Sequence, residues 1–179
     1  MDNDAIANFD RIICSLSAVA CQRLGMPAIT ERLHNEILLK MRYNIKTGYG
    51  TSTQTYGATE DNPMQGQGQG SGNAPSCWGA ISTPMWIALR AMCSHSFKAY
   101  SSDNNLQCEL QGVAFVDDAT NLLNDLGREP MTEETLVKSL QAMAQTWEKL
   151  LFSSGGALKP SKCYWFAITW QWANGFPIM

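Results

Sequence analysis

The sequence predicts an α+β fold in which helices pack on one face of an antiparallel sheet. Apolar residues at helical spacing form several segments, and short runs rich in β-forming residues lie between them. The central run, at residues 112–116, is Gly-Val-Ala-Phe-Val, and it leads directly into Asp117 and Asp118. It predicts a buried strand that ends at the aspartates. Along the chain the elements follow as strand, helices, loop, helix, strand hairpin, helix and strand. That order is typical of an α+β protein.

The first part of the chain predicts two helices and a short strand. The first helix starts after Asp10, which is predicted as its N-cap, and Gly25 and Pro27 end it. A second helix is predicted over residues 30–41, and residues 43–47 alternate in the manner of a strand. The inward face of the second helix is expected to hold Leu33, Ile37 and Leu38.

Residues 48–73 include the run Gly-Gln-Gly-Gln-Gly-Ser-Gly-Asn and are predicted to form a flexible Gly/Gln-rich loop. A linker is the simplest interpretation. Phosphate binding through backbone N–H groups is the alternative, but the GxxxxGK[ST] pattern of a P-loop is absent. After the loop, a long apolar helix is predicted from Pro75 to about Cys93, and Pro84 should kink or break it.

The last part of the chain predicts a helix and a strand. Thr132 is the expected N-cap of the helix, whose first turn is acidic. The apolar stripe of this helix is interpreted as core packing and comprises Leu136, Leu140, Met143, Trp147, Leu150 and Leu151. A strand is predicted over residues 164–172, and Asn174-Gly175 predicts a hairpin turn after it.

Composition places the chain among globular proteins of one domain. The 179 residues carry a net charge of −3, which is not the basic footprint of a free-standing nucleic-acid binder. The six cysteines form no CxxC pair, so we expect reduced, mostly buried thiols in an intracellular protein. No apolar run reaches the length of a membrane span. The sequence therefore predicts a soluble protein, in the cytoplasm or the nucleus.

Adjacent carboxylates at the end of an apolar strand require an explanation. Asp117 and Asp118 repel one another and are costly to desolvate. A Mg²⁺ ion would remove that cost, because hard carboxylate oxygens suit it. The alternative is that one of them caps a helix beginning at Ala119. Two-metal phosphoryl transfer needs acidic ligands from separate segments, and Asp4 is the further candidate.

Four segments resemble, in order, the palm motifs of retrotransposon reverse transcriptases, which are RNA-directed DNA polymerases. Residues 4–11, DAIANFDR, resemble the first palm motif, and residues 69–75, QGSGNAP, are similar to Gln-Gly-x-x-x-Ser-Pro. Residues 115–118, FVDD, resemble the aromatic-x-Asp-Asp box. Residues 155–163, GGALKPSKC, resemble the later motif that brings a lysine to the site. The sequence departs from the family's motifs at two positions. Ala74 replaces the usual Ser, and Asn8 stands where a small apolar residue is common.

The resemblance implies a polymerase palm and RNA-templated DNA synthesis by two-metal nucleotidyl transfer. It assigns Asp4, Asp117 and Asp118 to two Mg²⁺ ions, with Mn²⁺ as a possible substitute. It also implies that Lys162 lies near the pyrophosphate as a possible general acid for the leaving group.

The resemblance also implies substrate-binding roles. Phe9 would lie under the sugar and exclude a 2′-hydroxyl, and Gln69 and Gly70 would contact the incoming nucleotide and the templating strand. The implied partners are an RNA template, a DNA or RNA primer and deoxynucleoside triphosphates, with no membrane. Without the resemblance, Phe9 is simply a core residue and Lys162 a solvated turn residue.

The resemblance is to a palm alone, so residues 1–179 are expected to form one partial reverse transcriptase domain from a retroelement. Family members have fingers before the palm and a thumb after it, which a longer polyprotein would supply. We therefore expect the isolated chain not to extend a primer. Two alternatives remain open. One is a viral-type RNA-dependent RNA polymerase palm, which FVDD and Phe9 disfavour, and the other is a non-catalytic remnant that binds nucleic acid or a partner.

Overall fold

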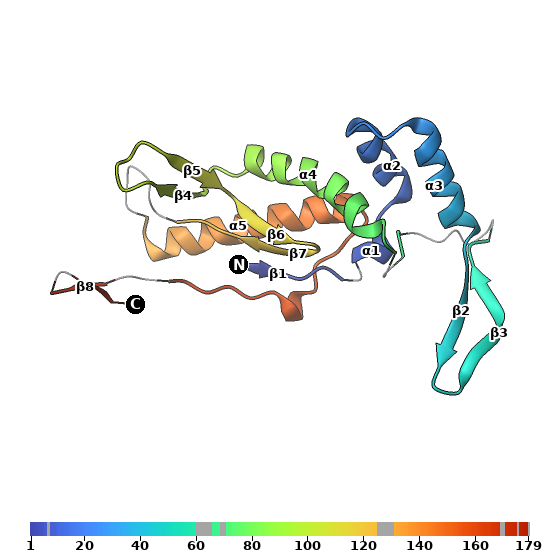
Figure 1. Ribbon diagram of the computed structural model, residues 1–179. Helices are drawn as coiled ribbons and strands as arrows, with labels where there is room; N and C mark the ends of the chain where they lie inside the picture. The colour runs from blue at the N-terminus through green and yellow to red at the C-terminus, as the bar shows by residue number, and fades with distance from the viewer. Residues whose placement is uncertain are drawn as a thin grey trace.

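The computed structural model describes residues 1–6, 8–59, 66–68, 71–124, 131–168, 171–174 and 176–178. Over these residues the chain has mixed α and β structure, with small antiparallel sheets. The central sheet has the strand order β1-β7-β6, with β1 at Asp2–Asn3, β7 at Asp118–Asn121 and β6 at Gly112–Phe115 (Figure 1). The predicted α+β class is confirmed at this level.

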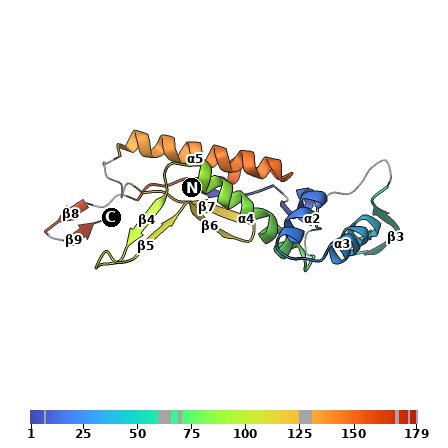
Figure 2. The same ribbon diagram turned by 90° about the horizontal axis from the view of Figure 1, so that it is seen from above.

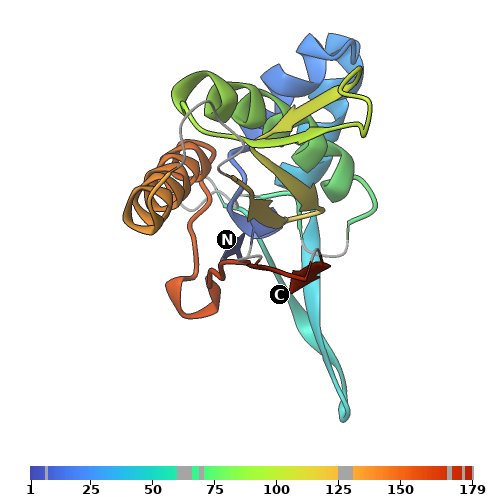
Figure 3. The same cartoon turned by 90° about the vertical axis from the view of Figure 1, so that its left-hand side faces the viewer.

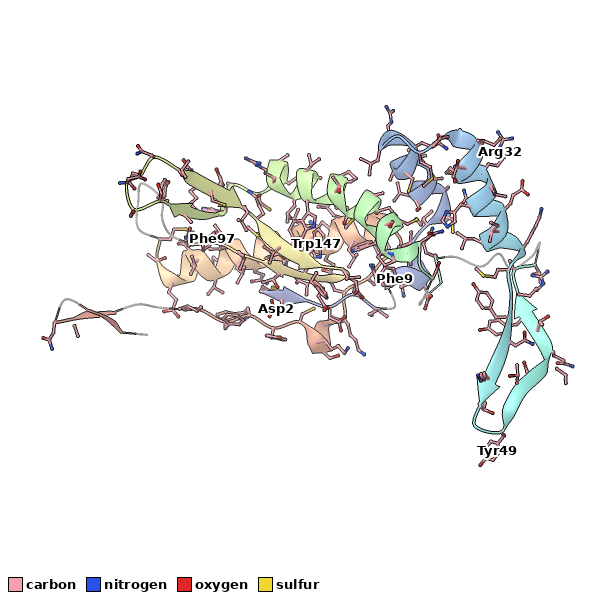
Figure 4. All side chains as sticks on the ribbon, viewed as in Figure 1. Asp2, Phe9, Arg32, Tyr49, Phe97 and Trp147 are labelled. Atoms are coloured by element: carbon pink, nitrogen blue, oxygen red, sulfur yellow. The ribbon has the colours of Figure 1, made fainter. Side chains whose placement is uncertain are left out.

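Two long helices cover one face of the central sheet. α4 spans Ala74–Met92 and α5 spans Glu133–Ser153. They pack against one another and against the sheet, as the view from above shows (Figure 2). The shared core consists of Ala5, Ile12, Trp78, Ile81, Met85, Leu89, Ala119, Met143, Trp147 and Leu151. Near its centre the Trp147 ring lies 4.5 Å from that of Trp86, between centroids (Figure 4).

The sequence predictions for α5 hold. The Oγ1 of Thr132 accepts a hydrogen bond from the backbone N–H of Thr135 at 3.3 Å, so Thr132 is the N-cap. Within the predicted stripe, Met143, Trp147 and Leu151 are buried, and the other three members are half-buried.

α4 runs without interruption through Pro84, so the predicted break is absent. Proline inside a helix costs about 3 kcal/mol, because it removes one hydrogen bond and crowds the preceding turn. Ile81 and Met85, on either side of it, are both buried in the core. We attribute the continuity of α4 to this packing.

The predicted first helix is divided in two. α1 spans Asn8–Arg11 and α2 spans Cys14–Arg23. The helix is interrupted between α1 and α2, because the backbone groups there bond elsewhere. The carbonyl of Ile12 accepts a hydrogen bond from Gly66 N at 3.0 Å, and Ile13 N donates one to Ser154 O at 3.1 Å. Asp10 therefore lies inside α1, and the prediction that it is an N-cap is wrong.

α3, at Ala28–Lys40, leads into a long hairpin of β2, Arg42–Thr47, and β3, Gly50–Gly57. Leu38 of α3 is buried as predicted, but Leu33 and Ile37 are more than half exposed, so their inward placement is wrong. The predicted strand at 43–47 is confirmed as β2. Because β3 lies within residues 48–73, the loop prediction fails for that part of the segment.

A second hairpin pairs β4, Phe97–Tyr100, with β5, Gln107–Leu110, just before β6. After α5 comes a single 3₁₀ turn, η1, at Pro160–Lys162. β8, Gln171–Ala173, and β9, Phe176–Ile178, then form a hairpin with Asn174 at a positive φ of 53°, which confirms the predicted turn.

The predicted strand over 164–172 is mostly absent, because within residues 165–168 no pairing with a described strand occurs. All six cysteines are free thiols, but only Cys21 and Cys77 are buried, so the expectation of mostly buried thiols is wrong. Of the helices in the described ranges, none has the length and apolar character needed to cross a bilayer.

Candidate functional site

The register of the central sheet brings Asp4 beside Asp118. β1 pairs with β7 through Asp2 opposite Thr120 and Asn3 opposite Ala119, so the next positions along the two strands are Asp4 and Asp118. These residues are 114 positions apart in the sequence. Their proximity therefore depends on the sheet and not on local structure.

Side-chain alternation places both carboxylates on the face of the sheet that the helices leave open. Asn3 and Ala119 are buried toward the helices, so Asp4 and Asp118, one position along each strand, point the other way. Phe115 lies opposite Asp118 on β6 and is 80% exposed. We call this surface, made by Asp2, Asp4, Val113, Phe115, Asp118 and Thr120, the open face.

The predicted strand before the aspartates is confirmed as β6, but the prediction that it is buried is wrong. β6 is largely exposed, and the chain turns back immediately, with Val116 and Asp117 forming the turn between β6 and β7. Asp117 is half-buried in this turn. Asp118 starts β7, which also excludes the alternative of a helix cap before Ala119.

The turn is held in a strained conformation by a buried side chain. Val116 has a φ of +57°, which is unfavourable for a β-branched residue. Its carbonyl accepts a 2.6 Å hydrogen bond from the Nε1–H of Trp78, a buried residue of α4. This bond attaches the turn to the core, and the turn contains Asp117.

Replacing Trp78 with Phe should therefore lower the free energy of unfolding by about 2 kcal/mol, because the Val116 carbonyl loses its donor and the smaller ring leaves a void at a buried position. Urea denaturation followed by circular dichroism measures this. An unchanged midpoint would show that the Trp78–Val116 bond contributes nothing to the stability of the turn.

Lys162 is brought to the same site by a segment that runs along the other edge of β1. Tyr164 bridges Asp2, Leu158 bridges Ala5, and Lys159 N donates to the carbonyl of Asp4 at 2.9 Å. Between these pairings η1 projects from the edge. The Nζ of Lys162 then lies 2.9 Å from Oδ2 of Asp4.

The electrostatics of this pair favour a protonated lysine. A hydrogen bond to Asp4, its negative charge and the charge of Asp118 raise the pKa of Lys162 above its usual value. The Lys162 side chain is 60% exposed and that of Asp4 24%, so solvent screens the pair. The ion pair therefore contributes little to the stability of the fold, and its main effect is to hold the charge of Lys162 beside Asp4.

The carboxylates offer the chemistry of a magnesium site but are not assembled into one. Asp4 and Asp118 are hard oxygen donors on one face, and the ammonium group of Lys162 is paired with Asp4 there. Over the described ranges, no three His, Cys, Asp or Glu side chains are grouped closely enough to hold a metal ion. The structure thus brings two of the three predicted ligands together and places Asp117 in the adjoining turn.

Phe9 is in α1, five residues after Asp4, and it is half-buried and packed against the core (Figure 4). Its carbonyl accepts a 2.7 Å hydrogen bond from Gln67 N. Gly66, with a φ of +89°, packs so closely on Asp10 that a Cβ added to Gly66 would lie 2.5 Å from the backbone of Asp10. Gln69 and Gly70 lie outside the described residues, so their predicted roles stay predictions.

Sequence reasoning missed several residues that build this site. Thr120 donates a 2.5 Å hydrogen bond to Oδ1 of Asp2 on the open face, and its position two residues after Asp118 is the signal for a shared face. Gln67 and Asn8 are fully buried, and none of their side-chain N and O atoms has a hydrogen-bond partner among the described residues. No sequence pattern pointed to Trp78 as the donor that holds the turn.

Comparisons with protein-family models, with curated proteins and with solved structures found no match.

Proposed function

We propose that the chain is a reverse transcriptase palm that adds deoxynucleotides to a primer on an RNA template. The observation that supports this most is the placement of Asp4 beside Asp118 on an open sheet face, with Lys162 at 2.9 Å from Asp4. These three residues come from three of the segments that resemble palm motifs. An antiparallel sheet backed by helices on one face is also what a palm requires.

In this proposal Asp4, Asp117 and Asp118 hold two Mg²⁺ ions, which when bound would activate the primer hydroxyl and neutralise the triphosphate. Asp4 approaches from β1, and Asp117 and Asp118 approach from the β6–β7 turn. Asp117 must then move with its turn for all three to share the ions. Lys162, protonated beside Asp4, is suited to give a proton to the leaving pyrophosphate.

The open face supports a substrate site as well. Phe115 and Val113 are mostly exposed there, and Tyr164, which bridges Asp2, is also more than half exposed. Aromatic and apolar groups next to carboxylates give a surface on which a base-paired primer end can lie. We expect the remaining parts of a longer polyprotein, the fingers and the thumb, to cover it.

Primer extension tests the proposal. A preparation that contains the chain with its fingers and thumb should extend a DNA primer on an RNA template with deoxynucleotides and Mg²⁺. Incorporation of ribonucleotides instead would favour the RNA polymerase alternative. A folded preparation that incorporates neither would contradict the proposal.

Replacing Phe9 with Val should relax the choice of sugar. In the proposed role, the ring blocks a 2′-hydroxyl by its size, so the smaller side chain should raise ribonucleotide incorporation by at least about tenfold, equivalent to roughly 1.4 kcal/mol of discrimination. Competition between matched ribo- and deoxynucleotides measures it. Unchanged selectivity would remove Phe9 from the sugar site.

A further inference from the structure

We infer that the β2–β3 hairpin is an arm that binds single-stranded nucleic acid before that strand reaches the site formed by Asp4 and Asp118. The hairpin, Arg42–Gly57, projects away from the rest of the molecule (Figure 3, in cyan). Two-stranded hairpins are marginally stable in water, so a projecting one needs its own stabilisation. In naming the strand as template, the inference rests on the proposed function.

The hairpin is braced internally and presents one aromatic ring at its tip. Tyr43 and Tyr56 stack across the strands with their ring centroids 5.4 Å apart. At the tip, Oγ1 of Thr47 accepts from Tyr49 N at 3.2 Å and donates to Gly50 O at 3.4 Å. The Tyr49 side chain is fully exposed and points away from the body (Figure 4).

Charge favours a polyanion as the occupant. Arg42 and Lys46 give the hairpin a charge of +2 without any acidic residue, whereas the whole chain is at −3, so the remainder carries −5. The other side chains are mainly Thr, Ser, Asn and Gln, which hydrogen-bond to phosphate and sugar. A cationic, acid-free surface with an exposed tyrosine matches the way single strands are held, by backbone contacts and base stacking.

The location fits the incoming template strand. β1 runs toward α1, so Asp4 lies at the end of the sheet nearest the N-terminal helices, and the hairpin lies beyond that end (Figure 1). It extends on the same side of the molecule as the segment that carries Lys162 (Figures 1 and 3). A strand held by Tyr49 and Lys46 would therefore approach the catalytic end of the open face.

The test measures binding without catalysis. The full chain is titrated against a fluorescein-labelled single-stranded RNA of about 16 nucleotides by fluorescence anisotropy, between about 50 and about 200 mM salt. Replacing Tyr49 with Ala should weaken binding at least about fivefold at every salt concentration, because one base loses its stacking partner. Replacing Lys46 with Ala should reduce the slope of log affinity against log salt by about 0.7, because one phosphate contact is lost.

Matched variants elsewhere control for general effects. Tyr100→Ala removes an exposed tyrosine from the β4–β5 hairpin, and Lys149→Ala removes an exposed lysine from α5. Neither should change affinity or slope. Because Tyr49 makes no packing contact, its replacement should leave the circular dichroism spectrum and thermal midpoint unchanged.

RNA affinities of the Tyr49 and Lys46 variants equal to those of the controls would overturn the inference. So would a change in self-association of the Tyr49 variant with unaltered RNA affinity, since the tip would then bind a second copy of the chain. Asp118→Asn separates this inference from the proposed function, because it should keep full RNA affinity. Loss of RNA binding in the hairpin variants supports the arm even where no preparation extends a primer.

Discussion

Replacing Asp118 with Asn should reduce nucleotide addition at least about 10³-fold, which corresponds to roughly 4 kcal/mol of lost metal-dependent stabilisation of the transition state. Asn keeps the size of the side chain but removes the charge that holds a divalent cation. Asp118 is exposed at the start of β7, so the fold should persist. Single-turnover primer extension measures the loss, and Asp117→Asn and Asp4→Asn should behave alike.

Asp103→Asn is the matched control for this prediction. Asp103 is an exposed carboxylate between β4 and β5, where it accepts hydrogen bonds from Ser101 and Asn105. Its replacement should leave extension unaltered. Retention of activity in the Asp118 variant, at a level near that of the control, would remove the carboxylate pair from the mechanism.

Replacing Lys162 with Met should lower kcat for nucleotide addition by about 10²-fold, the usual contribution of a positioned general acid. KM for the nucleotide should change less, because the proton is needed at the leaving pyrophosphate and not for binding. Lys162→Arg should retain the charge beside Asp4 while transferring the proton poorly. Steady-state kinetics with saturating template and primer separate the two parameters.

Lys159→Met controls for the loss of a positive charge from the same exposed segment. It should leave kcat unchanged, since only the backbone N–H of Lys159 contacts Asp4. If both lysine variants lose activity equally, the segment acts through its overall charge and Lys162 has no special role. A rise in KM alone would reassign Lys162 to binding the triphosphate.

Local signals in the sequence predicted local structure well. The N-cap at Thr132 and the buried stripe through Met143, Trp147 and Leu151 follow from capping chemistry and helical period. The turn at Asn174 follows from the preference of that residue for positive φ. In each case the pattern and its physical cause lie within a few residues of one another.

Predictions failed where distant parts of the chain decide the outcome. The break at Ile12 and Ile13 arises from hydrogen bonds to Gly66 and Ser154, which no local pattern encodes. The run before Asp117 has the composition of a buried strand, but its outer face has no covering layer among the described residues. Periodicity reports which residues share a face and not whether that face is covered.

In the candidate site, too, local features follow from the sequence and contacts between distant segments do not. Asp117 and Asp118 stand out as adjacent carboxylates, and Asp4 is a further acidic candidate from a separate segment, whereas Lys162 is indicated only by the resemblance to palm motifs. Pairing of β1 with β7 and with the segment around Tyr164 then places Asp4 beside both Asp118 and Lys162. No spacing rule predicts contacts over such separations, because they depend on strand register.

The central claim, that the open face binds divalent cations through its aspartates, is tested most directly by Mn²⁺ titration followed by electron paramagnetic resonance. The folded chain should bind Mn²⁺ saturably, Mg²⁺ should compete, and Asp118→Asn should abolish the binding while Asp103→Asn preserves it. Because the readout is ion binding, it does not depend on fingers, thumb or catalysis. Absence of binding by the folded chain, or equal binding by wild type and the Asp118 variant, would contradict the account and favour a non-catalytic role.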